Sequence, residues 1–140
     1  MLRIRAVLAI TALVTATACG SSMPAVPDQS NIAFSTVDLT VGTGATAEAG
    51  KTVSVTEAGW LYSDTAVDHK GTQFDPGSSF NLLMGARQVI PGFEQAVTGM
   101  QVGGLRRATI PPSLAYGSTG NGPIPPNAAL VFEIQLTNVQ

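Results

Sequence analysis

Apolar and polar residues alternate along several stretches of this 140-residue chain, and a period of two is typical of half-buried β-strands. The clearest case is Ala129–Val139, whose apolar face carries Leu130, Phe132, Ile134 and Leu136. Further strands are expected at Ile32–Leu39, Lys51–Tyr62, Thr72–Asp75, Phe80–Met84 and Leu105–Ile110. Pro76-Gly77 is expected to turn the chain between two of them, and 64–71 and 111–127 to form loops.

One segment changes to the period of a helix. From Pro91 onward, an apolar face repeats at positions i, i+3, i+4 and i+7: Phe93, Ala96, Val97 and Met100. Proline suits the first helical position, and Gly99 offers a stop. Two turns of helix are marginal in water alone, so the strands must pack around them. The sequence therefore predicts an α+β fold, in which a curved antiparallel sheet of about five or six strands wraps one short helix.

The start of this helix lacks a capping side chain. Ile90 precedes Pro91, where Ser, Thr, Asp or Asn would be usual. Backbone amides there are expected either to donate to a ligand carbonyl or to be satisfied by water.

The N-terminus has the pattern of an export signal. Met1–Arg5 is positively charged, Ala6–Val14 is apolar, and small residues precede Cys19. Cys19 resembles the lipidated cysteine of a bacterial lipobox, with plain cleavage after Ala18 as the alternative. We expect a signal peptide at 1–18, a flexible tether at 19–30 and one domain at 31–140. The protein would then be exported and held at the membrane by its lipid, facing the periplasm or the outer surface.

Composition excludes several classes of function. Without Arg3 and Arg5, five basic residues face nine acidic ones, a net charge of −4 that argues against nucleic acid. The only cysteine allows no internal disulfide, and the only histidine, His69, cannot form a metal site by itself. Nucleophile, phosphate-binding and dinucleotide motifs are absent. An enzyme of this sequence is expected to work with a shaped pocket and without metal or cofactor.

Aromatic residues offer such a pocket. Five of them come from separate elements that the fold could bring together: Phe74, Phe80, Phe93, Tyr116 and Phe132. The alternative is that these rings only fill the core.

Six motifs together resemble FKBP-type peptidyl-prolyl cis-trans isomerases. They are Phe74-Asp75, Gln88–Phe93, Val102–Gly104, Ile110–Gly117, Ile124–Ala128 and Leu130–Phe132, in the order and spacing of that family. The resemblance spans roughly Ile32 to Gln140. It implies catalysed rotation about the peptide bond before proline, with proline-containing peptides as substrates and macrolides as candidate inhibitors.

The resemblance also implies the site. Phe93 would form the pocket floor, while the Ile90 amide and the Tyr116 hydroxyl would hold substrate carbonyls. Asp75 would be the polar group facing the amide being rotated. The apolar walls would be Phe74, Phe80, Val89, Ile124 and Phe132.

Two departures from the family pattern stand out. Glu57 replaces the tyrosine that usually bonds the aspartate, and it shares the inward face of Val53 and Val55. We expect Glu57 close to Asp75, with the pKa of one carboxyl raised, unless a bulge turns Glu57 to solvent. The rim segments 76–79 and 121–123 are also short, so macrolide affinity does not follow from the resemblance.

Three functions remain open on these residues. The first is an exported, monomeric prolyl isomerase that assists protein folding. The second is a module that binds proline-containing segments but turns them over poorly because of Glu57. The third is a structural lipoprotein whose domain only mediates assembly.

Overall fold

A single curved sheet and one short helix make up the described part of the chain. The structure is a computed structural model and describes residues 26–140, so the expected signal peptide, Cys19 and most of the tether lie outside it. The strands are β1 (Ser35–Thr40), β2 (Thr52–Tyr62), β3 (Lys70–Leu83), β4 (Leu105–Ile110) and β5 (Leu130–Val139). All neighbours are antiparallel, in the order β1-β4-β5-β2-β3. The predicted α+β class is confirmed, with five strands in this region.

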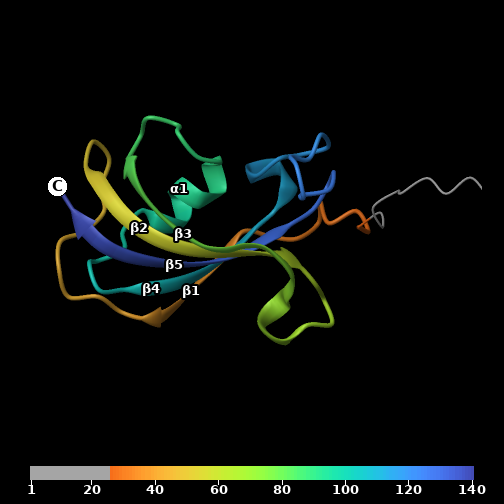
Figure 1. Cartoon of the computed structure of the whole chain (residues 1–140), viewed down its shortest axis with the longest axis horizontal. Helices are drawn as coiled ribbons and strands as arrows, with labels where there is room; N and C mark the ends of the chain where they lie inside the picture. The colour runs from red at the N-terminus through yellow and green to blue at the C-terminus, as the bar shows by residue number, and fades with distance from the viewer. Residues whose placement is uncertain (1–25) are drawn as a thin grey trace, which may run out of the picture.

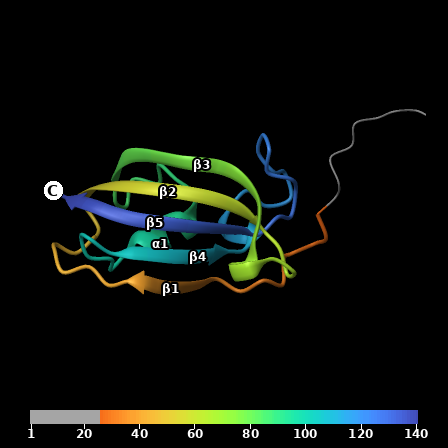
Figure 2. The same ribbon diagram turned by 60° about the horizontal axis from the view of Figure 1, so that its bottom comes forward.

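The helix α1 (Pro91–Val97) lies against one face of the sheet, on the side that Figure 1 shows uppermost. Its buried residues include Phe93, Ala96 and Val97, three of the four predicted positions, and Met100 is buried just beyond its end. Gly92 allows the close approach, since a Cβ there would collide with Ile110 of β4. Figure 2 shows the sheet from its other face, with α1 behind it.

A positive side chain from the sheet completes the end of α1. The guanidinium of Arg106 on β4 donates to the carbonyls of Ala96 and Thr98, at 2.9 and 3.2 Å. It also pairs with Asp38 of β1 at 2.6 Å. A cation at a helix C-terminus satisfies carbonyls that lack intrahelical partners. The two-turn helix is therefore stabilised by the tertiary structure.

The expected turn at Pro76-Gly77 is wrong. Both residues lie inside β3, which runs without interruption for 14 residues. Register shows why: Glu57 pairs with Ser78 and Gly59 with Asp75, so two residues of β3 face Ala58 alone. This is a β-bulge in an edge strand, where a proline without an N–H costs little. The same composition that predicts a turn also suits a bulge.

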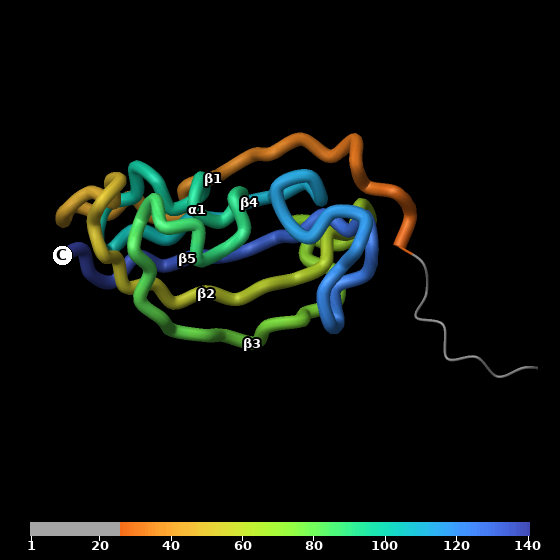
Figure 3. The backbone as a smooth tube through the Cα atoms, turned by 90° about the horizontal axis from the view of Figure 1, so that it is seen from above, coloured from red at the N-terminus to blue at the C-terminus, as the bar shows by residue number. Residues whose placement is uncertain are grey.

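The remaining boundaries differ from prediction by a few residues. β1 begins at Ser35, three residues later than expected, and β3 begins at Lys70, inside the expected loop. Two short 3₁₀ turns, Val67–His69 and Pro112–Leu114, lie in the two expected loops. The tube in Figure 3 shows the second of these loops on the same side of the sheet as α1.

Candidate functional site

A cavity of about 220 Å³ lies between α1 and the concave face of the sheet, at the entrance of the helix. We call it the helix-side cavity. It is lined by Glu57, Phe74, Asp75, Phe80, Gln88, Val89, Ile90, Phe93, Tyr116 and Phe132. Every site residue predicted from the sequence is among them except Ile124, and Gln88 is an addition.

Four phenylalanine rings form one connected group around the cavity. Phe93 meets Phe132 edge to face at a centroid distance of 5.4 Å, and Phe132 meets Phe74 in the same way at 5.6 Å. Phe80 lies 5.8 Å from Phe93 in a tilted arrangement. These are favourable geometries for aromatic pairs. Gly59 is required beneath them, because a Cβ there would come within 2.6 Å of Phe74.

The segment before α1 is fixed by side chains rather than by a cap. The Gln88 Oε1 accepts from the Leu83 N–H at 3.0 Å, and the Glu94 Oε1 accepts from the Gly85 N–H at 2.6 Å. Ile90 has no side-chain cap, and its carbonyl accepts from the amides of Phe93 and Glu94. Its own amide has no acceptor among residues 26–140. A backbone donor is thus left free beside the apolar wall.

Asp75 sits at the bulge of β3 and is held by the bulge itself. Its carboxylate accepts from the Gly77 N–H at 2.9 Å and from the Ser78 hydroxyl at 3.0 Å. The hydrogen bond from Gly77, with further donation from Ser78, lowers the pKa of Asp75 below its usual value. The bulge therefore supplies the donors that keep this carboxylate ionised. No local pattern in the sequence predicts this role for Gly77 and Ser78.

Glu57 lies beside Asp75, as predicted. It points inward from β2 and is only 7 % exposed. Burial raises the pKa of Glu57 to about 8, and the neighbouring Asp75 charge contributes to the rise. The prediction of a close pair with one raised pKa is confirmed. The bulge considered as the alternative does exist, but its extra residue is on β3 and Glu57 stays buried.

Tyr116 and Ile124 belong to the long loop between β4 and β5. Tyr116 follows the 3₁₀ turn Pro112–Leu114 and lines the cavity, half-buried. Ile124 packs in the core at 6 % exposure and does not line the cavity. A tight turn directs it there, since Asn121 and Ile124 exchange two backbone hydrogen bonds of 2.9 Å.

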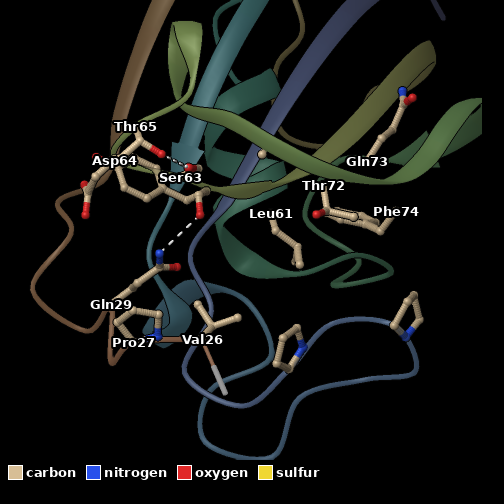
Figure 4. A pocket seen from close by; sticks show the side chains of 14 residues that line it. Val26, Pro27, Gln29, Leu61, Ser63, Asp64, Thr65, Thr72, Gln73 and Phe74 are labelled. Atoms are coloured by element: carbon tan, nitrogen blue, oxygen red, sulfur yellow. Dashed lines mark hydrogen bonds between the residues drawn. The ribbon is translucent and has the colours of Figure 1, made fainter. Parts of the chain in front are cut away.

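A larger hollow of about 680 Å³ lies beyond the Phe74 ring, and we call it the loop-side groove. Phe74 lines both hollows. Figure 4 shows the groove, with Leu61 and Phe74 on one side and Val26, Pro27 and Gln29 on another. Gln29 is buried, although the sequence placed it in a flexible tether, and packing therefore begins earlier than residue 31.

Neither hollow offers a metal site. Within residues 26–140, no three His, Cys, Asp or Glu side chains lie close enough together to hold an ion. Over the same residues, no helix combines the length and apolar character needed to cross a membrane.

Known proteins resemble this chain in sequence and in structure. The family described as FKBP-type peptidyl-prolyl cis-trans isomerase matches residues 43–137. The "FK506-binding protein" of Neisseria meningitidis serogroup A is 39% identical over 103 residues, which cover 73% of this chain and 92% of that protein. The "46 kDa FK506-binding nuclear protein" of Spodoptera frugiperda is 41% identical over 107 residues, but this chain spans only 24% of its length.

A solved structure shares the fold as well. The crystal structure of AtFKBP13 superposes with a TM-score of 0.66 at 28% sequence identity. The match covers 76% of this chain and 93% of that one.

Proposed function

This chain belongs to the FKBP-type peptidyl-prolyl cis-trans isomerase family, and from that premise we propose that it accelerates rotation about Xaa-Pro bonds in protein substrates. Amide resonance sets a barrier of about 18–20 kcal/mol, so the uncatalysed exchange takes tens of seconds or more. The twisted transition state has lost resonance and carries less charge separation than the planar amide. A pocket that removes water from the amide therefore binds the twisted form better, which lowers the barrier.

The helix-side cavity has the properties that this chemistry needs. The proline ring enters the group of four phenylalanine rings, with Phe93 as the floor and Val89 beside the entrance. The backbone amide of Ile90 and the hydroxyl of Tyr116 donate hydrogen bonds to carbonyl oxygens of the substrate. Asp75 faces the rotating bond. No proton transfer or covalent bond is required. The observation that carries the proposal is a ring-lined cavity next to an unpaired backbone donor.

The runner-up is a binding module that grips proline-containing segments without turning them over. Glu57, in place of the expected tyrosine, is the residue that favours it. Macrolides are candidate inhibitors of either function, because several relatives are named for binding FK506.

A protease-free isomerisation assay on a blocked Xaa-Pro peptide separates the two functions. We expect the purified protein to accelerate exchange catalytically, and FK506 to compete with the peptide for the cavity. Saturable peptide binding without acceleration would establish the binding module instead. Neither binding nor acceleration would leave only a structural role for the domain.

We also propose that the protein acts on exported proteins as a monomer tethered to the membrane through Cys19. The support lies in residues 1–19, whose charge and apolar pattern fits a lipoprotein signal. Cys19→Ser should release the protein from the membrane fraction, and retention of that variant would contradict the tether.

A further inference from the structure

Glu57 is a buried acid whose surroundings do not suit a charge. β2 alternates between its two faces, so Glu57 shares the inward face with Val55 and Gly59, and all three are buried. Its neighbours across the sheet are Ser78 on β3 and Ile134 on β5. Its Oε2 has no hydrogen-bond partner among the described residues. A carboxylate here would carry an uncompensated buried charge, whereas a neutral acid costs far less.

The neighbouring carboxylate shows where the proton lies. The carboxyls of Glu57 and Asp75 are within hydrogen-bonding reach of each other, and two carboxyl groups can bond only if one of them is protonated. Asp75 already accepts from the Gly77 amide and the Ser78 hydroxyl, which favour its charged form. Among residues 26–140, no N–H or O–H group donates to the Oε2 of Glu57. The proton therefore belongs on Glu57, and its O–H points to Asp75.

Nothing else around the cavity changes this assignment. From β5 the cavity receives Phe132, and from α1 it receives Phe93, both apolar. The remaining titratable group in the lining is Tyr116, and no Lys, Arg or His is in the lining. The negative charge of an ionised Glu57 would therefore meet only Asp75, a like charge.

We propose that Glu57 is a positioning residue of the isomerase reaction: in its neutral form it donates a hydrogen bond to Asp75 and fixes that carboxylate against the rotating amide. This inference rests on the proposed function. It assigns to a carboxylic acid the donor role that a hydroxyl would otherwise fill. Unlike a tyrosine, the acid loses its proton under mildly alkaline conditions, and turnover becomes sensitive to pH. The pKa of about 8, raised mainly by burial, places that loss just above neutrality.

The test is a pH profile of kcat/KM between pH 6 and 9.5, on a blocked peptide without titratable groups. We expect the wild type to lose about tenfold between pH 7 and pH 9, as the neutral acid disappears. Glu57→Gln keeps an N–H donor at every pH. Its kcat/KM should stay within about threefold of the wild-type value at pH 7 and should not change with pH. Glu57→Ala has no donor and should be about tenfold slower at neutral pH, also with a flat profile.

A matched control is Asp64→Asn, which neutralises an exposed acid in the loop-side groove and should leave the profile unchanged. Circular dichroism of each variant checks folding. A flat wild-type profile, or a Glu57→Ala profile that still falls like the wild type, would overturn the inference.

A ¹³C NMR titration of the Glu57 carboxyl reads the same group without activity. Catalysis absent at every pH would remove the proposed function and the positioning role with it. An ordinary titration of Glu57 in an active enzyme would remove only this inference. The two failures are therefore distinguishable.

Discussion

The two buried polar side chains of the described region, Gln29 and Glu57, lie on the two hollows that share Phe74 and differ in how they are satisfied. Both are 7 % exposed. The Gln29 amide donates to the Tyr62 carbonyl at 3.2 Å, and its oxygen accepts from the Ala129 N–H at 2.8 Å. Glu57 keeps one oxygen without a partner. Gln29 therefore joins the N-terminal segment to the sheet, while Glu57 keeps an oxygen that no described residue satisfies.

The two hollows also differ in volume, and the hollow beside the satisfied Gln29 is the larger one. The loop-side groove is about 680 Å³ and the helix-side cavity about 220 Å³. The larger hollow is lined mostly by loop residues and strand ends, and both polar atoms of its buried Gln29 side chain have a hydrogen-bond partner. The smaller one has a ring cluster, a free amide and a carboxyl pair. The comparison teaches that unsatisfied and perturbed groups, more than volume, mark the hollow that is the better candidate for a substrate site.

The largest expected effect comes from exchanging amide and acid at these two positions. For Glu57, a folded pKa near 8 against an unfolded value near 4.5 means that its favourable contribution is complete below pH 4.5 and is lost as pH rises to 8. Over that window the stability of Glu57→Gln relative to wild type should rise by on the order of 4 kcal/mol. Urea unfolding at both pH values measures the change. If the difference in unfolding free energy between Glu57→Gln and wild type were the same at both pH values, Glu57 would not be a buried, protonated acid with a raised pKa.

The reverse exchange, Gln29→Glu, should have the opposite sign at neutral pH. It removes the donor to Tyr62 and places a charge among bonded groups, at a cost of about 2 kcal/mol. If this variant and wild type were equally stable at pH 7, position 29 would tolerate a carboxyl as well as an amide, and the proposed difference between the two buried sites would be contradicted.

Filling each hollow with the same side chain gives the next largest effect. Val89→Trp should occlude the helix-side cavity and reduce kcat/KM about 100-fold, close to 3 kcal/mol. Thr72→Trp occupies the loop-side groove and should change turnover of a short peptide less than twofold. Thermal unfolding confirms that both variants are folded. If Thr72→Trp reduced kcat/KM more than Val89→Trp, the loop-side groove would be the better candidate for the substrate site.

The smallest effect concerns the ion pairs on the other face of the sheet. Arg107 bonds Asp68 and Glu133, each at 2.9 Å, and thereby holds the β2–β3 loop that borders the groove. Because Asp68 is largely exposed, Arg107→Gln should cost only about 1 kcal/mol, less at high salt. Peptide turnover should not change. A clear loss of turnover in this variant would connect the loop to the helix-side cavity.

Two site residues followed from local periodicity, and the other predicted site residues from the family resemblance. The period of two puts Glu57 on the same face as Val53 and Val55, and the helical period puts Phe93 toward the sheet. The expected turn at Pro76-Gly77 failed because the same two residues suit a turn or a bulge, and only pairing with β2 decides between them. Ile124 was predicted to line the cavity but packs in the core, because the tight turn between Asn121 and Ile124, which the sequence pattern does not predict, directs it there.

The sequence by itself determined the α+β class, the single short helix and the aromatic set, whereas the pairing of β2 with β3 decided that Glu57 stays turned inward. The tertiary structure decided which carboxyl is neutral, which buried polar group is satisfied and what completes the end of α1. Periodicity depends on neighbours along the chain. Hydrogen-bond satisfaction depends on partners such as Gln29 and Ala129, 100 residues apart, which only the folded chain brings into contact.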